Sequence, residues 1–228
     1  MEDSLPLCKD MTRIVFIRHG QSQANLESRF AGHLDVPLTE LGRTQARLAA
    51  DYIVKREKID KIYSSDLSRA YDTALEASKL TDLPITTAKE LREICSGVWQ
   101  GRLVSEIEVE YAKEYYTWRH DYANARLPQG ESVAEVYNRV VTFVKQKARE
   151  NDGLTLLFAS HASPMRAVEC ASHGWGYERM AEIKFMNNSS ISIYEYDSST
   201  DALTLIERNI TEHLDPSKMS YVPKGLQN

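Results

Sequence analysis

Two histidines in this sequence each follow directly after a short apolar run. The run 14–17 is followed by Arg18 and His19, and the run 154–160 is followed by His161. Short runs rich in β-branched and aromatic residues are typical of strands buried on both faces of a parallel sheet. Such sheets bind ligands at the carboxyl ends of their strands, so neighbouring strands would place both imidazoles side by side. A neutral imidazole is a competent nucleophile, and the adjacent cation would suit a phosphate-bearing ligand.

Two further features would support an anion site at this edge of the sheet. Gly20 lets the backbone turn sharply or approach an anion closely. Ser65 or Asp66 can cap a helix that begins at Leu67, which places Arg69 in the first helical turn. Unpaired N–H groups and the positive end of the helix dipole favour an anion there. The simpler interpretations are a histidine that bonds a neighbouring carbonyl and an arginine that faces solvent.

The elements that must position these residues alternate between strands and helices. Thr39 caps a helix that ends near Arg56, and Ser132 with Glu135 forms a capping box for a later helix. We expect an α/β fold, a three-layer sandwich with a mostly parallel central sheet, helices on both faces and an antiparallel hairpin at the edge. The expected strands are 14–17, 61–64, 84–87, 154–160, 190–196 and 202–208.

The segments near the expected site complete this pattern. Residues 103–122 carry tyrosines and other apolar side chains at helical spacing, which is more often a core face than a substrate-binding surface. Ser163 as N-cap and Pro164 in the first turn start a helix directly after the second histidine. The segment 91–101 reads as a glycine-punctuated loop, and Glu93 lies in it.

The length of 228 residues suits one large α/β domain better than two small ones. No internal repeat or linker interrupts the chain. We expect a loose leader over residues 1–12, a single catalytic domain over 13–208 and a polar, loose tail over 209–228.

Composition favours a globular protein with a small partner. Hydrophobic residues make up 42% and charged residues 27%, which are ordinary values, and the net charge of −5 disfavours binding to nucleic acid. Cys8, Cys95 and Cys170 are odd in number and widely spaced, so neither a disulfide framework nor a zinc site is indicated. With no apolar run long enough for a signal peptide or a membrane span, we expect a cytosolic protein without a membrane partner. Association into a homodimer stays open.

Four motifs occur in order along residues 13–208, and each alone is weak. They are Arg18-His19-Gly20-Gln21-Ser22 with Asn25, Ser64-Ser65-Asp66-Leu67-Ser68-Arg69-Ala70 with Thr73-Ala74, Glu93 before Gly97, Trp99 and Gly101, and Ser160-His161 after a strand. Together they are specific, and the chain resembles the histidine phosphatase superfamily in its phosphoglycerate-mutase-like branch.

The resemblance implies a cofactor-independent and metal-independent phosphomonoesterase that acts through a phosphohistidine. His19 matches the family's nucleophile, which is phosphorylated while the alcohol of the substrate leaves. Glu93 matches the residue that protonates the leaving oxygen and then activates water against the phosphohistidine. The implied partner is a small-molecule phosphate ester.

The resemblance also implies a set of phosphate contacts. Arg18, Arg69 and His161 match the family's phosphate pocket, where cations would neutralise the phosphoryl oxygens and a protonated His161 would serve best. Asn25 matches a further contact with the phosphate. Ala162 stands where many members have glycine, but its backbone N–H would still be available to a phosphate oxygen.

Departures from the family favour a phosphatase over a mutase, which remains the alternative. The mutases carry a tyrosine and a lysine where this chain has Ser96 and Val104. They also hold the substrate carboxylate with paired arginines, to which Arg119-His120 is the nearest approach, and the connection over 122–130 is short for a mutase lid. Inorganic phosphate release without a bisphosphoglycerate primer would distinguish the two.

Three other interpretations are less favoured. A phosphate-binding regulatory protein with low turnover would have no use for Glu93 as a proton shuttle. The branch of secreted acid phosphatases differs after the Arg-His-Gly triplet, where this chain has Ser22-Gln23-Ala24, and it depends on disulfides. A metal enzyme is disfavoured because the remaining histidines are scattered, lack ligand spacing and read as ordinary surface or helix-end residues: His33, His120, His173 and His213.

Overall fold

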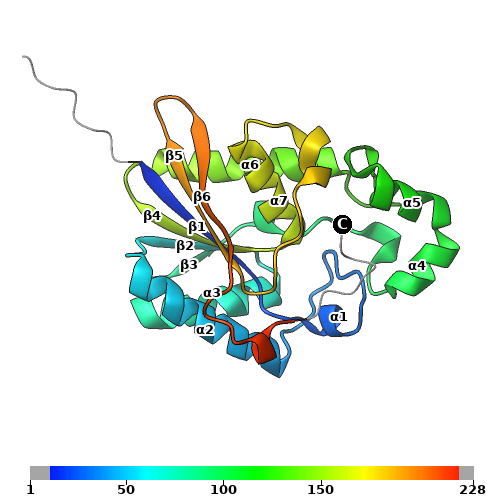
Figure 1. The fold of residues 1–228 in the computed structure, drawn as a ribbon, viewed down its shortest axis with the longest axis horizontal. Helices are drawn as coiled ribbons and strands as arrows, with labels where there is room; N and C mark the ends of the chain where they lie inside the picture. The colour runs from blue at the N-terminus through cyan, green and yellow to red at the C-terminus, as the bar shows by residue number, and fades with distance from the viewer. Residues whose placement is uncertain (1–10, 221–228) are drawn as a thin grey trace, which may run out of the picture.

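The structure, a computed structural model, describes residues 11–220. Its centre is a six-stranded sheet in the order β3-β2-β4-β1-β5-β6, with helices on both faces (Figure 1). Strands β3, β2, β4 and β1 are parallel, and β5 and β6 form an antiparallel hairpin at the edge beside β1. The expected three-layer α/β architecture is therefore confirmed. The strands are β1 Thr12–Arg18, β2 Lys61–Ser64, β3 Ile85–Thr87, β4 Thr155–Ser160, β5 Ile191–Asp197 and β6 Ala202–Ile210.

The helices form two layers and a group outside them. Helices α2 and α3 cover one face of the sheet, α6 and α7 cover the other, and α4 and α5 stand beyond the layers (Figure 1). The α-helices are α1 Gln23–Leu26, α2 Glu40–Arg56, α3 Ser68–Thr81, α4 Val104–Glu110, α5 Ala112–His120, α6 Val133–Glu150 and α7 Ala162–Ser172. Short 3-10 turns lie at Lys89–Leu91, Gly97–Trp99, Tyr122–Asn124, Tyr177–Glu182 and Pro216–Lys218.

Strand β1 divides the core because alternate side chains point to opposite faces of a sheet. Ile14 and Phe16 pack in the cluster beneath α6 and α7, whereas Val15 and Ile17 pack in the cluster beneath α2 and α3. All four side chains are at most 1% exposed. This burial on both faces is the physical reason why the run carries no polar alternation.

The pairing of β1 with β4 decides where the two histidines lie. The two strands are parallel and in register, so that Arg18 lies opposite Ser160. The residues that follow are therefore neighbours across the sheet edge, and the N–H of His19 donates to the Ser160 carbonyl at 3.0 Å. The expectation that both histidines share one carboxyl edge is confirmed.

Several helix boundaries differ from the expected ones. Helix α3 begins at Ser68 with Leu67 as its N-cap, and the Ser68 N–H donates to the Asp35 carboxylate at 2.7 Å. The expected cap residue Asp66 forms an ion pair with Arg92 instead. Helix α7 begins two residues earlier than expected, with His161 rather than Ser163 as its N-cap. The capping box of Ser132 at the start of α6 is present as expected.

The expected helix over 103–122 is instead two helices that break at Tyr111. The rings of Tyr111, at the break, and of Tyr115 and Trp118, on α5, lie 6.2 to 6.4 Å from the ring of Trp99. As expected for a core stripe, Tyr115, Trp118 and Tyr122 are buried.

The ends of the domain also differ from the expected boundaries. Strand β1 begins at Thr12, inside the expected leader, and residues 1–10 with Cys8 lie outside the described part of the chain. Strand β6 continues to Ile210, and the segment after it packs on the domain, because Gln45 donates to the Lys218 carbonyl and to the Ser220 hydroxyl. Within residues 11–220, no helix is long and apolar enough to cross a membrane.

Candidate active site

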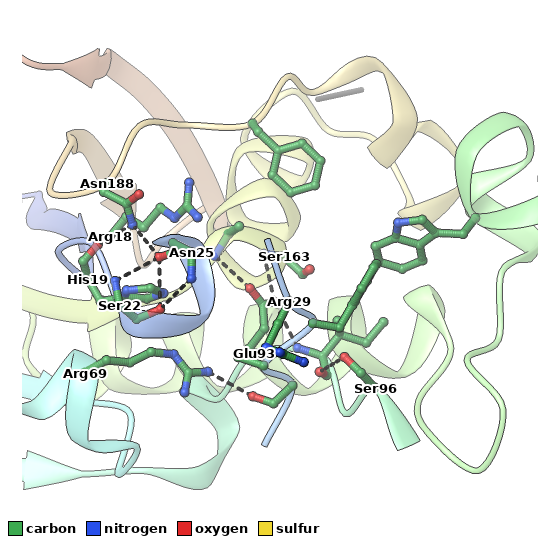
Figure 2. Close-up of a pocket in the computed structure, with 17 residues that line it drawn as sticks. Arg18, His19, Ser22, Asn25, Arg29, Arg69, Glu93, Ser96, Ser163 and Asn188 are labelled. Carbon is green, nitrogen blue, oxygen red and sulfur yellow. Dashed lines mark hydrogen bonds between the residues drawn. The ribbon is translucent and has the colours of Figure 1, made fainter. Parts of the chain in front are cut away.

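A pocket opens at the carboxyl ends of β1 and β4, with about 760 Å³ of empty space when the open solvent at its mouth is included. In Figure 2, Arg18, His19, Asn25 and Asn188 gather at one side of this pocket, with Glu93 between them and Ser96. Four apolar side chains also line the pocket: Phe30, Ile94, Trp118 and Phe185. The full lining is Arg18, His19, Ser22, Asn25, Arg29, Phe30, Ala31, Gly32, Arg69, Glu93, Ile94, Ser96, Trp118, Ala162, Ser163, Phe185 and Asn188.

The two expected histidines form one cluster. Their ring centroids lie 5.0 Å apart. The Nδ1 of His19 lies 2.7 Å from the Gly20 carbonyl, which can only accept, so this nitrogen carries the proton and leaves the Nε2 lone pair free. His161 is fully buried, its Nε2 lies 2.9 Å from the Ser65 hydroxyl, and it is not among the residues that line the pocket. The arrangement presents one imidazole to a ligand and supports it with the other.

The two expected arginines are almost fully buried beside these rings. Arg69, which is 1% exposed, donates to the carbonyls of Gly32 and Leu34 at 2.9 Å, and Arg18 donates to the Met186 carbonyl. Burial lowers the pKa of each arginine to about 10. Both side chains remain charged near neutral pH, so the pocket holds two desolvated cations that no carboxylate pairs directly among the described residues.

Asn25 lies where the resemblance expects it, and a second asparagine orients it. Its Oδ1 accepts from the backbone and hydroxyl of Ser22 and from the Nδ2 of Asn188, each at 3.1 Å. Asn188 also donates to the His19 carbonyl at 3.0 Å. Since the oxygen of Asn25 is engaged, its amide nitrogen is the group left to donate to a ligand.

Glu93 lies next to the expected phosphate contacts. Its Oε2 accepts from the backbone N–H of Ala162 at 3.1 Å, and its Oε1 accepts from the N–H groups of Ser163 and Ile94 at 3.1 and 2.9 Å. The carboxylate therefore occupies the N-terminus of α7, where anions are stabilised. The Ala162 N–H that we expected to face a phosphate oxygen is bonded to Glu93 instead.

Gly20 serves packing rather than a turn toward an anion. A Cβ on this residue would lie 2.3 Å from the carbonyl oxygen of Gly42 on α2. The N–H of Gly20 donates to the Thr73 hydroxyl at 3.1 Å, and that hydroxyl donates to the Arg69 carbonyl at 2.7 Å. Close approach to α2, which only glycine allows here, thus connects the loop after β1 to the start of α3.

The histidines are held in their neutral forms. Burial and the nearby Arg69 and Arg18 hold the pKa of His19 well below its ordinary value of 6.5. Burial, Arg69 and His19 lower the pKa of His161 in the same direction. The protonated His161 suggested by the resemblance is therefore disfavoured here, since two guanidinium groups already supply positive charge.

Proton uptake by these rings should be measurable. We expect the NMR signals of the His19 and His161 rings, assigned from alanine variants and followed from about pH 8 to 5, to titrate with midpoints well below 6.5. Unfolded imidazoles bind protons below about pH 6.5 while these folded ones do not, so the free energy of unfolding should fall as pH drops through that value. A midpoint at or above 6.5 for either ring would contradict the assignment.

No sequence pattern predicts the roles of several site residues. Asn188 precedes β5 in an irregular segment, and the motif that contains Ser65 does not predict its contact with His161. Phe185 and Trp118 line the pocket, although only Trp118 belongs to a recognisable helical stripe. His33, interpreted as an ordinary surface or helix-end histidine, is half-buried and lies 2.8 Å from the Glu93 carbonyl. Their positions depend on contacts between distant segments.

The structure also shows where the residues that differ from the mutase pattern lie relative to the pocket. Ser96 lines the pocket with its small side chain, and Val104 is buried in the core at 7% exposure, away from the lining. Arg119 and His120 belong to the last turn of α5 and are not lining residues. Within residues 11–220, no group of three or more histidine, cysteine, aspartate or glutamate side chains could hold a metal ion.

Comparison with known proteins agrees with this geometry. Residues 14–209 match the family model of the histidine phosphatase superfamily (branch 1). The chain is 34% identical over 204 residues to phosphoserine phosphatase 1 of Hydrogenobacter thermophilus, and the match covers 90% of this chain and 95% of that protein. It is 30% identical over 191 residues to phosphoglycerate mutase-like protein 4 of Arabidopsis thaliana, and this match covers 81% of this chain and 80% of that protein.

A solved structure gives the same result. The native structure of a mycobacterial glucosyl-3-phosphoglycerate phosphatase superposes with a TM-score of 0.80 at 30% identity, covering 88% of this chain and all of that one. Both the match to the family model and the similarity to whole relatives extend across the residues that form the pocket. The chain therefore belongs to the histidine phosphatase superfamily, branch 1, and is an enzyme of its phosphatase type.

Proposed function

We propose that this protein hydrolyses a small phosphate monoester through a phosphohistidine on His19, with Glu93 as the proton donor. The observation that carries the proposal is the convergence of three groups in one pocket. A neutral imidazole with a free Nε2, two buried guanidinium groups and a carboxyl group all line it. Nucleophile, charge stabilisation and proton transfer are the three functions that this reaction requires.

In the first half-reaction, the Nε2 lone pair of His19 attacks phosphorus and the bond between phosphorus and the leaving oxygen breaks. Arg18 and Arg69 stabilise the charge on the phosphoryl oxygens, and Asn25 donates to one of them. A protonated Glu93 transfers its proton to the leaving oxygen, so that the product departs as an alcohol. The proton on Nδ1 of His19 stays there and is donated to the Gly20 carbonyl, which fixes the tautomer throughout.

In the second half-reaction, water replaces the alcohol. The Glu93 carboxylate accepts a proton from water while the water oxygen attacks phosphorus, and the bond between phosphorus and Nε2 breaks. Inorganic phosphate leaves and Glu93 is protonated again. His161 stays bonded to Ser65. The dianion in the pocket would raise the proton affinity of both histidines.

Hydrolysis is favoured over phosphoryl transfer to a second hydroxyl. A mutase must hold its carboxylate-bearing substrate in the pocket while the phosphoryl group moves to a second hydroxyl. The positions of the mutase tyrosine and lysine are occupied here by Ser96, which lines the pocket, and by the core residue Val104. Two relatives are named as phosphatases of phosphoserine and of glucosyl-3-phosphoglycerate. The first substrates to test are therefore alkyl phosphates that carry a carboxylate.

The product balance tests the proposal. With phosphoserine, 3-phosphoglycerate and glycerol phosphate as separate substrates, in chelator and without a bisphosphoglycerate primer, we expect release of one inorganic phosphate for each ester consumed. Water is the acceptor in this mechanism, so a primer should not raise the rate. Turnover that begins only with primer and yields an isomeric ester instead of phosphate would establish the mutase alternative.

A further inference from the structure

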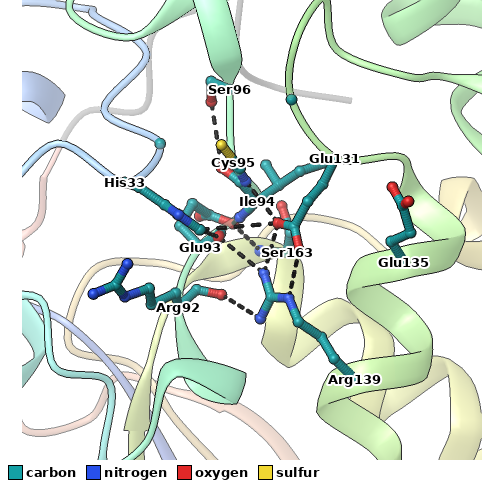
Figure 3. Close-up of polar contacts among 12 residues, drawn as sticks. His33, Arg92, Glu93, Ile94, Cys95, Ser96, Glu131, Glu135, Arg139 and Ser163 are labelled. Atoms are coloured by element: carbon teal, nitrogen blue, oxygen red, sulfur yellow. Dashed lines mark hydrogen bonds and ion pairs between the residues drawn. The ribbon is translucent and has the colours of Figure 1, made fainter.

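The loop that carries Glu93 is held from behind by a single arginine of α6. Arg139 donates from Nη1 to the carbonyls of Glu90 and Arg92 at 2.7 and 2.9 Å, and from Nη2 to the carbonyl of Glu93 at 3.0 Å. Figure 3 shows its guanidinium group between this loop and Glu131. Three carbonyls within four residues thus converge on one planar donor group, which a lysine could not reproduce.

Glu131 orients this arginine and also forms hydrogen bonds with the same loop directly. Its carboxylate forms a bidentate pair with Arg139, from Nε to Oε1 at 2.8 Å and from Nη2 to Oε2 at 2.9 Å. Its Oε2 also accepts from the N–H of Cys95 at 2.7 Å, and its own N–H donates to the Cys95 carbonyl at 2.9 Å. The loop is therefore held on both sides of Glu93, at residues 90–93 and at Cys95.

Two backbone approaches make this arrangement tight. A Cβ on Gly130 would lie 2.1 Å from the Cys95 carbonyl oxygen, and a Cβ on Gly97 would lie 2.0 Å from the Pro128 carbonyl oxygen. Gly97 also has a φ of +51°, which favours glycine. The segment before α6 and the loop after Glu93 thus pack backbone against backbone, with little room for displacement.

His33 adds a further contact to the Glu93 carbonyl and lies near Glu131, with its Nε2 3.9 Å from the Glu131 Oε2. Its Nε2 lies 2.8 Å from the Glu93 carbonyl, which therefore bonds both His33 and Arg139. The neighbours of His33 in the chain, Gly32 and Leu34, supply the carbonyls that accept from Arg69. The backbone of Glu93 is thereby connected to the segment that holds a phosphate-site arginine.

Arg139 and Glu131 do not belong to the pocket lining, and their side chains are 19% and 21% exposed. They cannot bind the substrate from this position. Their hydrogen bonds go to the backbone on which the Glu93 carboxyl group is carried, and a displacement of about 1 Å in such a group can cost on the order of 10²-fold in rate.

We propose that Arg139, oriented by Glu131, is a positioning residue that holds Glu93 at the distance required for proton transfer to the leaving oxygen. This inference rests on the proposed function, in which Glu93 is the proton donor. Loss of the arginine should therefore impair proton transfer selectively, and leave phosphate binding by Arg18 and Arg69 in place.

The test compares Arg139→Met with wild type in single-turnover phosphorylation of two esters. One is the alkyl phosphate used best among phosphoserine, 3-phosphoglycerate and glycerol phosphate, and the other is p-nitrophenyl phosphate, whose leaving group needs no proton. We expect on the order of 10²-fold loss on the alkyl ester, a several-fold smaller loss on the aryl ester, and little change in KM. Arg139→Lys and Glu131→Gln should show the same selectivity with smaller losses.

Arg149→Met is the matched control, because Arg149 lies on the same helix, also pairs with a carboxylate, Asp201, and is remote from the pocket. It should leave both rates unchanged. In a Glu93→Gln background, Arg139→Met should lower the phosphorylation rate on the alkyl ester almost no further, because the effects of two residues that act through one group are not additive. If Arg139→Met does not fold, Arg139→Lys and Glu131→Gln decide the outcome by the same ratio.

The outcomes separate this inference from the proposed function. Equal losses on both esters for the Arg139 and Glu131 variants, no loss for either, or a full further loss in the Glu93→Gln background would each overturn the positioning role. If Glu93→Gln itself shows no preference between the esters, the assignment of Glu93 as proton donor fails, whatever the Arg139 variants do.

Discussion

We expect the His19→Ala variant to lose both turnover and phosphoenzyme formation completely. Removal of a covalent nucleophile costs on the order of 10⁶-fold in turnover, because the pocket lining, among the described residues, offers no second imidazole to attack phosphorus. His161 does not substitute for it, since it is fully buried with its Nε2 bonded to Ser65. The measurement is labelled phosphate retained on protein after a rapid quench. Wild type should hold an acid-labile, base-stable label, as a phosphoramidate on imidazole does.

The fold should survive this change. Among residues 11–220, the His19 side chain forms a hydrogen bond with the neighbouring Gly20 carbonyl alone, and its ring is held neutral among cations. We expect a change in stability of about 1 kcal/mol, or roughly 2–4 °C in melting temperature. His173→Ala, at the exposed end of α7, is the matched control and should retain full activity and label. Label that persists in the His19→Ala protein would reject this residue as the nucleophile.

Glu93→Gln should lower phosphorylation by an alkyl phosphate on the order of 10²-fold or more, the usual scale of general acid catalysis. The loss should be distinctly smaller with p-nitrophenyl phosphate, because its leaving group departs without a proton. Since Glu93 also activates water, the variant should accumulate phosphohistidine with the aryl ester. The burst and the steady state must therefore be measured separately.

The controls for Glu93→Gln follow from its contacts. The carboxylate accepts three N–H bonds, from Ile94, Ala162 and Ser163, and a carboxamide can accept at one oxygen only. Some local loss of stability is therefore expected, and melting temperature should be recorded for each variant. Glu90→Gln makes the same change at an exposed residue of the same loop and should leave both esters unaffected. Equal losses in the burst rate on both esters for Glu93→Gln would reject it as the acid.

The sequence by itself determined the elements that depend on short-range signals. Short apolar runs without polar alternation predicted the strands at 14–17 and 154–160, and Ser132 with Glu135 predicted the start of α6. These signals are local, because periodicity and capping involve residues within a few positions of one another. The order of four motifs was likewise sufficient to indicate the family, and with it His19, Arg69 and Glu93.

The tertiary structure decided how these residues meet. Only the pairing of β1 with β4 brings His19 to His161, and only burial beside Arg69 makes both rings neutral rather than protonated. The Ala162 N–H is bonded to a carboxylate that lies 69 residues away in the chain. No local pattern encodes such contacts, because they depend on which segments pack together.

The same reason explains the contacts around the Glu93 loop. His33 and Arg139 approach one carbonyl from segments 60 and 46 residues away, and neither carries a motif that predicts it. Their types are ordinary for a loop and for a helix surface, so sequence reasoning assigned them no role. What the sequence determined is the chemistry available at the sheet edge. What the fold decided is the position and charge of each group there, since desolvation and hydrogen bonding arise only when distant segments pack.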